Sequence, residues 1–499
     1  MTALEKLHIM RKTKGDVLTH GLSDEVISDF LKSDENLEKA INSAFKCFEQ
    51  IQKEFAELID MGEREQMRHV QSDFVNFYSE DAVNPYVSVA AKGPWLITLK
   101  GAVLHDNGGY GMLGAGHAPD FVLETMSRPH VMANIMTPSI PQMRLTRALK
   151  KEVGHTQGQC PFEKFVCMNS GSEAVTVAAR ISDINAKKVT EAGGRHAGKK
   201  IKIMSLKGAF HGRTDRPAQY SDSSLPGYKK YLASFAERDN LITIPINDVD
   251  ALKKAFDKAE KENVFVESLF MEPVMGEGNP GMSITREFYE TARQLTKDNG
   301  TLLLVDSIQA GLRAHGCLSI VDYAGFEGID PPDMETYSKA LNAGHYPMSV
   351  LAMTDATSKM YVKGVYGNTM TANPKAMDVA YEVLTRVDSN LRKNIVERGK
   401  EFVQKLKGLQ QKLNGKVTNV QGTGLLFSCE LAPEYKAYGI DSIEEYMRFR
   451  GIGVIHGGAN SLRFTPHFAI TSKEVDLIID AVEYAILNGP KANALDKAS

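Results

Sequence analysis

Short apolar runs alternate with amphipathic stretches through the middle of the chain. Five runs of four to six residues have the composition of buried strands: Phe165–Met168, Ile201–Leu206, Leu269–Val274, Leu302–Val305 and Ser349–Met353. Helical patterns lie between several of these runs, over Glu173–Val189 and Arg286–Asn299. Strands separated by helices predict a largely parallel sheet covered on both faces, which is an α/β fold. Such sheets bind ligands at the carboxyl ends of their strands.

A charged helical pattern precedes this region, from Asn36 to about Arg68. Apolar residues recur there at steps of three, four or seven, as one apolar helix face requires: Leu37, Ile41, Phe45, Phe48, Phe55, Leu58 and Ile59. We expect an N-terminal helical extension over residues 1–71. It either covers the body of its own subunit or docks on a partner subunit.

Helix-like and strand-like segments alternate again after about Asp388, and the chain closes with a helix. Thr471 and Glu474 predict a capping box at its start, and Gly489 and Pro490 predict its end. We expect a smaller α/β domain over residues 72–124 and 386–499. Residues 125–385 then form the large domain.

Composition narrows the choice of partner and compartment. The 499 residues are 42% hydrophobic and 24% charged, with a net charge of -3. This balance gives no electrostatic reason to expect nucleic acid or a membrane surface as partner. The chain contains no run of about 18 apolar residues, so we expect no membrane span. The N-terminus lacks the apolar core of a secretory signal, and Glu5 and the scarcity of Ser argue against a mitochondrial presequence.

The cysteines are scattered and form no CxxC pair. They are Cys47, Cys160, Cys167, Cys317 and Cys429. This pattern argues against a disulfide framework and against a zinc site, so we expect no metal. It fits a reducing compartment, and we expect the protein in the cytoplasm.

Two polar clusters contain turns that follow apolar runs. The residues Met168–Ala174 include Asn-Ser-Gly-Ser-Glu, a small turn feeding a helix, whose free N–H groups suit a phosphate. Many strand-to-helix turns look like this, and a plain turn is the alternative. In Gly208–Thr214, Phe210 stands beside His211 and could stack on a planar ring, or simply pack in the core.

Two further clusters place an ionisable residue after a predicted strand. Asp306 ends the run Leu302–Val305 and is either a helix N-cap or a buried carboxylate that pairs with a cofactor cation, such as a protonated pyridine nitrogen. Lys339 lies among small residues and could form an imine if its pKa is lowered. The alternative for Lys339 is an ordinary surface lysine.

The joint occurrence of these clusters, in this order, resembles the class III aminotransferases of the ornithine and 4-aminobutyrate type, which use pyridoxal-5′-phosphate (PLP). The resemblance spans roughly Val83 to Ile486. Its motifs are the turn from Asn169 to Ala174, Phe210 to Thr214, Glu272-Pro273, Gly276 to Gly278, Asp306 with Gln309, Gly311 and Arg313, Ser338-Lys339, Asn368-Thr369, Asn373-Pro374 and Leu462 to Phe464. It implies PLP fold type I, in which a mostly parallel seven-stranded sheet lies between helices beside a smaller α/β domain.

The same resemblance assigns roles to individual residues. Gly171 and Ser172 would bind the cofactor phosphate, and Phe210, beside His211, would stack on the pyridine ring. Asp306 would pair with the ring nitrogen, and Gln309 would approach the phenolic oxygen. Lys339 would be the Schiff-base lysine. Thr369 would reach the phosphate of the neighbouring subunit's cofactor, which implies a homodimer with shared active sites. Arg463 would bind a substrate carboxylate, and Glu277 would pair with Arg463 while an ω-amino substrate is bound.

Three positions depart from the family pattern. Ser307 stands where the family usually has Glu, Tyr366 where His is common, and Met275 where a polar residue is usual. The first two leave the cofactor anchors intact. Met275 lies nearer the expected substrate side and leaves the choice of amine open.

The expected activity is transfer of an amino group from a terminal amine or ω-amino acid to a keto acid such as 2-oxoglutarate. A PLP-dependent racemase, aminomutase or decarboxylase would need the same cofactor residues and is the alternative. A non-catalytic relative is disfavoured, because Lys339 and Asp306 are both present.

Overall fold

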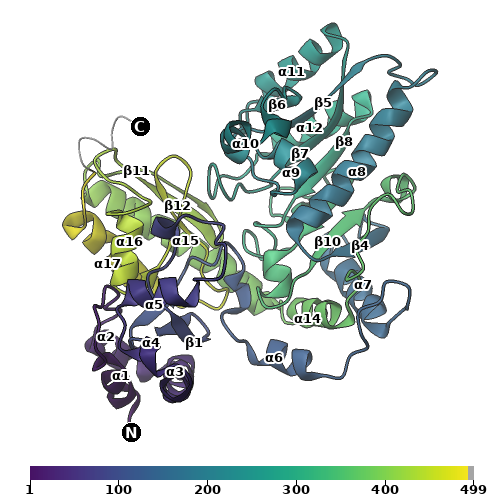
Figure 1. Ribbon diagram of the computed structural model, residues 1–499. Coiled ribbons are helices and arrows are strands. Elements are labelled where there is room, and N and C mark those ends of the chain that lie inside the picture. The colour runs from purple at the N-terminus through teal and green to yellow at the C-terminus, as the bar shows by residue number, and fades with distance from the viewer. Residues whose placement is uncertain (493–499) are drawn as a thin grey trace. The chain divides into compact units, whose positions relative to one another are not determined.

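The computed structural model describes residues 1–492, the side chain of Asp81 excepted, and divides into two compact units. The first unit comprises Met1–Asp120, Arg398–Gln421 and the chain from Phe427 onward (Figure 1). The second comprises Phe121–Glu397 and Gly422–Leu426. The N-terminal helices therefore belong to the same compact unit as the segment that follows them. The predicted domain boundaries remain a prediction.

A seven-stranded sheet forms the centre of the second unit. Its strands are β4 (Lys164–Met168), β5 (Lys200–Leu206), β6 (Leu241–Ile244), β7 (Val264–Met271), β8 (Leu302–Asp306), β9 (Met334–Tyr337) and β10 (Ser349–Met353). The order is β4-β10-β9-β8-β7-β5-β6. β10 pairs antiparallel with β4 and with β9, and the remaining pairs are parallel. Because β10 is antiparallel to both β4 and β9, β4 points the same way as the other strands. Their carboxyl ends therefore meet at one edge of the sheet, as predicted.

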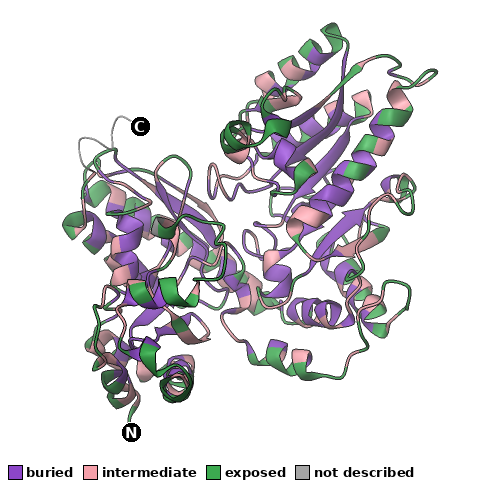
Figure 2. Ribbon diagram, viewed as in Figure 1, coloured by how far each residue is buried: buried purple, intermediate pink, exposed green. Residues whose placement is uncertain are grey.

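Helices cover both faces of this sheet. The helices that lie mainly in this unit are α6 (Asp120–Ser127), α7 (Ile140–Glu152), α8 (Gly171–Thr190), α9 (Asp215–Tyr220), α10 (Leu225–Tyr231), α11 (Val249–Lys261), α12 (Arg286–Asn299), α13 (Asp355–Ser358) and α14 (Pro374–Thr385). The long helix α15 (Ser389–Lys412) begins in this unit and continues into the first. Every residue of β7, β8, β9 and β10 is buried, which requires cover on both sides (Figure 2). The mostly parallel α/β sheet predicted from the apolar runs is confirmed.

The first unit contains two four-stranded sheets. One has the order β1-β2-β3-β13, with β1 (Ser88–Lys92), β2 (Trp95–Thr98), β3 (Val103–Asp106) and β13 (Ile452–Gly453). The other has the order β11-β12-β15-β14, with β11 (Val417–Thr423), β12 (Leu426–Leu431), β15 (Ser461–Phe464) and β14 (Ile455–Gly457). The helices α16 (Ile443–Phe449) and α17 (Ser472–Asn488) complete this part. The predicted capping box of Thr471 and Glu474 begins α17, and Gly489 ends it.

The N-terminal extension forms five helices within the first unit. They are α1 (Ala3–Arg11), α2 (Asp24–Leu31), α3 (Glu35–Glu54), α4 (Ala56–Ile59) and α5 (Glu63–Val70). The apolar face predicted for this segment is buried, with one error: Phe55 is 48% exposed. α3 ends at Glu54, so Phe55 leaves the helical register that would have turned it inward. The buried Lys100 binds the extension through the carbonyl oxygens of Lys14 and Ile59.

None of the described helices is long and apolar enough to cross a membrane.

Candidate active site

The start of α8 offers unused backbone donors at the carboxyl edge of the sheet. The Ser170 hydroxyl caps the helix by accepting from the Glu173 N–H. Among the described residues, no hydrogen bond uses the N–H groups of Gly171 and Ser172. A Cβ at Gly171 would lie 2.6 Å from Cδ1 of Ile308, so a larger residue there would require the Ile308 side chain to shift. The turn predicted to bind a phosphate thus has free N–H groups at the positive end of a 20-residue helix.

The loop after β5 packs directly on this helix start. Gly212 has φ +120°, and a Cβ there would lie 2.3 Å from Oγ of Ser172. The next N–H, that of Arg213, donates to the same Ser172 oxygen at 3.3 Å. Phe210 lies three residues before Arg213, and the guanidinium carbon of Arg213 is 5.1 Å from the centroid of the Phe210 ring. Two segments predicted separately, the phosphate turn and the aromatic-histidine pair, therefore lie against each other.

Asp306 is a buried carboxylate held by three donors. Its Oδ2 lies 2.8 Å from Nδ1 of His211, and its Oδ1 accepts from the Thr336 hydroxyl at 3.1 Å and from the Ile308 N–H at 3.2 Å. Asp306 is 4% exposed. His211 thus supports the carboxylate from the loop after β5, and Thr336 supports it from the neighbouring strand β9. The orientation of Asp306 is fixed by both neighbours.

Glu272 is a second buried carboxylate in this region, to which the sequence reasoning gave no role. Its two oxygens accept from the N–H groups of Phe210, at 3.0 Å, and Gly276, at 2.9 Å. Burial raises the pKa of Glu272 to about 7. The charge of Asp306 also raises this pKa, whereas His211 lowers it. The signal in the sequence was a glutamate inside an apolar run. That run was predicted as a strand to Val274, whereas β7 ends at Met271.

Lys339 begins a short 3-10 helix, Lys339–Asn342, directly after β9. Its φ of +43° lies in the left-handed region, which is unusual for a residue with a side chain and often marks a functional position. The preceding Ser338 hydroxyl donates to the Met348 carbonyl at 2.8 Å and holds the turn. Lys339 is half-buried rather than a surface lysine.

Gln309 and the Gly276-Glu277 turn lie against each other. Gln309 is 7% exposed, and a Cβ at Gly276 would lie 2.2 Å from its side-chain carbonyl carbon. Glu277 follows on the same turn and is half-buried. Met275, just before the turn, is fully buried.

Thr369 is exposed in the loop between α13 and α14. Its neighbour Asn368 donates through its side-chain amide to Glu173 Oε1 at 2.7 Å, within the same chain. The loop therefore lies beside the start of α8. Whether Thr369 serves the partner's site stays a prediction.

Ser307, where the resembled family usually has Glu, donates to a buried carboxylate from the next strand. The acceptor is Glu335 Oε1, at 2.6 Å. Glu335 also accepts from the Ile320 N–H and from the Ser319 and Tyr337 hydroxyls, and burial raises its pKa to about 7. The chain thus carries a carboxyl group behind Asp306 even though residue 307 is a serine.

Arg463 lies on β15 in the first unit. It is 1% exposed, and its guanidinium carbon lies 5.5 Å from the centroid of the Tyr110 ring. Burial, together with the Tyr78 hydroxyl, raises the pKa of Tyr110. Two residues after Arg463, the N–H of Thr465 donates to the Asn107 carbonyl at 2.8 Å, and its hydroxyl accepts from the Gly111 N–H at 3.2 Å. These bonds fasten the loop that carries Tyr110 to the strand that carries Arg463.

Residues 77–486 match the family Aminotransferase class-III. The chain belongs to this family. Acetylornithine aminotransferase of Methanocaldococcus jannaschii is 28% identical over 415 residues, 80% of this chain and 93% of the relative. Acetylornithine/succinyldiaminopimelate aminotransferase of Yersinia pestis is also 28% identical, over 64% of this chain and 73% of the relative.

Solved class III structures share the fold. The ornithine aminotransferase of Toxoplasma gondii superposes with a TM-score of 0.73 at 23% identity, over 87% of this chain and 98% of that one. The acetylornithine aminotransferase of Elizabethkingia anophelis gives a TM-score of 0.67 at 22% identity, over 85% of this chain and 99% of that one. A second Toxoplasma structure has PLP at partial occupancy in its active site. The fold is PLP fold type I, and this class III aminotransferase is a PLP-dependent transaminase.

The residues of the second unit fit PLP. The N–H groups at the start of α8 suit its phosphate, and the buried Asp306 suits a protonated ring nitrogen. Bound PLP supplies the electron sink that acidifies a substrate C–H bond.

Proposed function

We propose that this class III aminotransferase moves an amino group from a terminal amine or ω-amino acid to a keto acid such as 2-oxoglutarate. The observation that carries the proposal is the buried Arg463 beside Tyr110. The planar fork of a guanidinium suits a carboxylate, which it can bind through two parallel hydrogen bonds. Arg463 therefore supports a substrate with a carboxylate that must be bound in one half-reaction.

Glu277 extends this argument to two kinds of substrate. A glutamate that pairs with Arg463 would neutralise it while a donor without a carboxylate at that place is bound. The same glutamate would move aside when glutamate or 2-oxoglutarate enters. Glu277 follows Gly276 on a turn and is half-buried. One site then serves both half-reactions.

The reacting groups come from the second unit. Lys339 would hold the cofactor through Nζ, and the same atom would move the proton at the substrate carbon that bears the amino group. Asp306, oriented by His211 and Thr336, would keep a proton on the ring nitrogen. Gly171 and Ser172 would hold the phosphate, Phe210 would cover the ring, and Gln309 would approach the phenolic oxygen. Two half-reactions on one site imply ping-pong kinetics.

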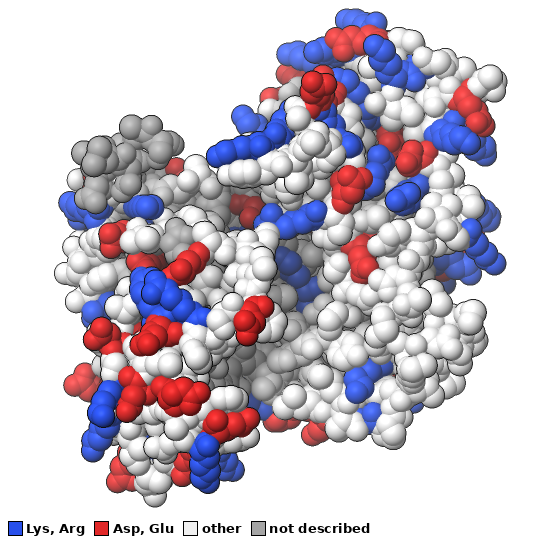
Figure 3. Space-filling model, in the orientation of Figure 1, with Lys and Arg blue, Asp and Glu red and all other residues white. Residues whose placement is uncertain are grey.

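The partner that we propose is a second copy of the chain, with active sites shared between subunits. An exposed apolar segment supports this: Val131, Met132, Ile135, Met136, Ile140 and Met143 are all exposed, and Met136 is 85% exposed. Lys, Arg, Asp and Glu side chains are interspersed over much of the face in Figure 3, but its lower right, where Figure 1 places α6 and α7, is mostly white. A weakly charged area with several exposed apolar side chains is typical of a protein interface.

A half-reaction screen tests the proposal. The holoenzyme is mixed with single amines, and the absorbance of the lysine-bound cofactor is followed as it converts to the amine form. Terminal amines and ω-amino acids should convert it, and 2-oxoglutarate should convert it back. If only α-amino acids convert the cofactor, the proposed donor class is wrong. If 2-oxoglutarate and other dicarboxylic keto acids fail to restore it, the proposed acceptor is wrong.

A further inference from the structure

Two histidines and a glutamate from distant parts of the chain meet inside the first unit. His105 lies on β3, His467 in the loop after β15, and Glu474 in the first turn of α17. The Nε2 atoms of both histidines contact the same oxygen, Oε1 of Glu474, at 3.0 Å from His105 and 2.8 Å from His467. His105 is 0% exposed, Glu474 4% and His467 9%. The three side chains thus meet at a point that is shielded from water.

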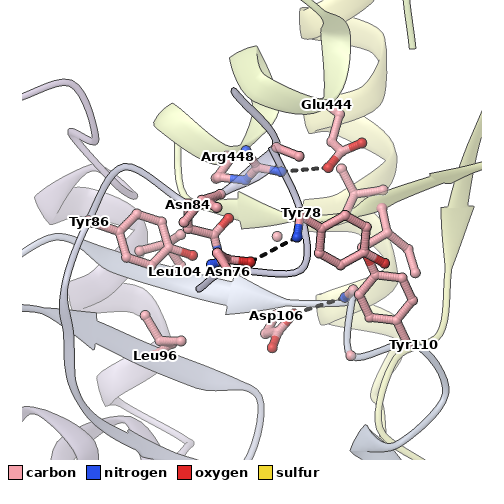
Figure 4. Close-up of a pocket in the computed structure, with 17 residues that line it drawn as sticks. Asn76, Tyr78, Asn84, Tyr86, Leu96, Leu104, Asp106, Tyr110, Glu444 and Arg448 are labelled. Atoms are coloured by element: carbon pink, nitrogen blue, oxygen red, sulfur yellow. Dashed lines mark hydrogen bonds and ion pairs between the residues drawn. The ribbon is translucent and has the colours of Figure 1, made fainter. Parts of the chain in front are cut away.

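The direction of His105 follows from the alternation of side chains along β3. Its neighbours Leu104 and Asp106 line a pocket on one face of the strand (Figure 4). His105 therefore points to the opposite face. There the ring of Trp95, its partner on β2, packs edge-on against it with 5.0 Å between the ring centroids. Trp95 is the only tryptophan of the chain, so its fluorescence reports on this place alone.

Glu474 begins α17 with one oxygen and faces the histidines with the other. Its Oε2 accepts from the N–H and from the hydroxyl of Thr471, both at 2.7 Å, in the capping box of the helix. Its Oε1 accepts only from the two imidazole rings among the described residues. Glu474 can therefore bind another group through Oε1 without losing the start of the helix.

Asn107 determines which nitrogen of His105 carries the proton. Its side-chain nitrogen lies 3.1 Å from Nδ1 of His105 and 3.3 Å from the His105 carbonyl oxygen. Its Oδ1 is buried and has no hydrogen-bond partner among the described residues. In this orientation Nδ1 accepts, and Nε2 donates to Glu474. If the amide turns over, Oδ1 accepts from an Nδ1–H, and Nε2 has a lone pair to offer. Metal-bound histidines are oriented by such an acceptor.

Two imidazole nitrogens and a carboxylate oxygen are a ligand set that zinc and other divalent transition metals accept. The three ligand atoms of this group all lie within 4.8 Å of one another. Ligand atoms around a tetrahedral zinc ion are roughly 3.3 Å apart, given bonds of about 2.0–2.2 Å. Both Nε2–Oε1 distances are slightly shorter than this, so small side-chain movements would admit an ion. Calcium and magnesium are disfavoured, because they prefer oxygen ligands.

We propose that His105, His467 and Glu474 bind a divalent transition metal ion, with zinc as the best match, and that the ion cross-links β3, the loop after β15 and α17. On binding, each Nε2 gives up its proton and Nδ1 carries one instead, so both rings stay neutral. Asn107 is a positioning residue for His105. The expectation of no metal rests on the cysteines, and this group contains none. The inference does not depend on the proposed substrates.

Metal analysis of the holoenzyme gives the first test. Protein purified without a histidine tag and without chelators should contain about one zinc ion per chain, measured by elemental mass spectrometry. After the metal has been removed with a chelator, cobalt(II) should rebind. It should give the visible absorption of a four-coordinate ion and quench the fluorescence of Trp95, whereas magnesium should do neither. Metal-loaded protein should also unfold at a higher temperature than chelated protein.

Two ligand variants assign the binding to this site. Glu474→Gln keeps a residue that can serve the capping box but removes the carboxylate, and His467→Gln removes one ring. Each should lower the affinity for cobalt about a hundredfold or more and abolish the effect of metal on the unfolding temperature. His117→Gln is the matched control, because Nε2 of His117 also contacts a carboxylate of the first unit, that of Asp106, at 3.0 Å. It should bind metal as the wild type does.

A pair of substitutions at Asn107 tests how His105 is oriented. Asn107→Leu should lower the cobalt affinity about tenfold to a hundredfold, because Nδ1–H loses its acceptor. Asn107→Asp still offers an acceptor and should keep the affinity. This pair decides the question if the ligand variants fail to fold, since neither substitution touches the metal or the helix cap.

Two results overturn the inference. If the holoenzyme contains no transition metal and binds neither zinc nor cobalt in titration, the three side chains form a hydrogen-bonded group only. If metal binds equally well to the wild type, Glu474→Gln and His467→Gln, it is an adventitious ion elsewhere on the protein.

Discussion

The Nδ1 atom of His211 lies 2.8 Å from Oδ2 of Asp306. This hydrogen bond joins the loop after β5 to the end of β8, and both residues are buried. Glu272 holds the same loop from the other side through the Phe210 N–H. The carboxylate proposed to face the cofactor nitrogen is therefore held by a neighbouring loop that also carries Phe210, the residue proposed to stack on the ring. Moving either group would disturb both of these proposed contacts.

Asp306→Asn should slow the amine half-reaction about a hundredfold or more, because an amide keeps the ring nitrogen protonated less well than a carboxylate does. Its thermal unfolding should change far less. Stopped-flow absorbance and circular dichroism measure the two effects. Asp322→Asn is a matched control, since Asp322 is equally buried but binds the Gly154 and Thr156 N–H groups. It should affect stability more than rate. Nearly wild-type turnover in Asp306→Asn would remove the role given to Asp306.

Lys339→Ala should abolish transamination and leave a folded protein that still binds PLP non-covalently. Borohydride reduction of the wild type, followed by peptide mapping, should find the cofactor on the peptide that contains Lys339. Lys207→Ala, which changes an exposed lysine after β5, should keep full activity. Labelling of any other lysine would contradict the assignment.

The sheet and the positions of Asp306 and Lys339 could be predicted because they depend on local pattern. A buried strand needs an unbroken apolar run, and the chain must place its polar residues just beyond it. Asp306 is the last residue of β8, and Lys339 comes two residues after the end of β9, both at the expected edge of the sheet. The prediction that Phe55 lies on the buried helix face was wrong, because the apolar periodicity of the sequence continues past Glu54, where α3 ends.

Contacts between distant segments were not predictable in this way. Nothing local links Ser307 to Glu335, which meet because β8 and β9 are neighbours in the sheet. Tyr110 faces Arg463 because Thr465 fastens the loop 107–111 to the end of β15. A pocket beside Tyr110 is lined by Tyr86 and Arg448, which come from segments that are far apart in sequence. These positions become visible only when the strands are paired.

Glu335 should make folding stability depend on pH. Burial raises its pKa from the ordinary 4.5 to about 7 in the folded protein. The folded state then keeps a proton that the unfolded state releases between these values, so this contribution is full below about pH 4.5 and is lost as pH rises to about 7. The loss is at most about 3 kcal/mol. Glu335→Gln resembles the protonated acid. The free energy of unfolding of this variant, measured with denaturant, should therefore change less between pH 5 and pH 8 than that of the wild type.

Glu191 is exposed, and Glu191→Gln serves as the control for that series. It should leave the pH dependence of the free energy of unfolding unchanged. A Glu335→Gln curve parallel to that of the wild type would mean that Glu335 is ionised throughout this range.

Mixed dimers should recover activity if the sites are shared. A Lys339→Ala chain and a Thr369→Ala chain each lack one contribution, and each homodimer should be weak. In a heterodimer, one site receives the intact Lys339 from one chain and the intact Thr369 from the other. Co-expression with two affinity tags isolates this species. Activity no higher than that of the separate variants would count against a phosphate contact from Thr369 across the interface.

The last prediction concerns Arg463 and Glu277, which we propose act differently in the keto-acid half-reaction and in the amine half-reaction. Arg463 is buried on β15, and its position is fixed by pairing with β12 and β14. If it binds the carboxylate of 2-oxoglutarate, Arg463→Ala should slow that half-reaction about tenfold to a hundredfold, the range for a lost charge-assisted bidentate contact.

The amine half-reaction of Arg463→Ala should change less, because a terminal amine without a carboxylate at that place makes no such contact. Glu277→Ala should act in the opposite sense. It leaves the charge of Arg463 unmasked, so the amine half-reaction should slow while 2-oxoglutarate still binds. Stopped-flow traces of both half-reactions, for both variants, give four rates to compare with the wild type. Arg463→Lys keeps the charge but loses the planar fork, so it should recover part of the keto-acid rate. Equal losses in both halves for Arg463→Ala would show that Arg463 supports the fold of the site rather than a carboxylate, and the acceptor would have to be sought elsewhere.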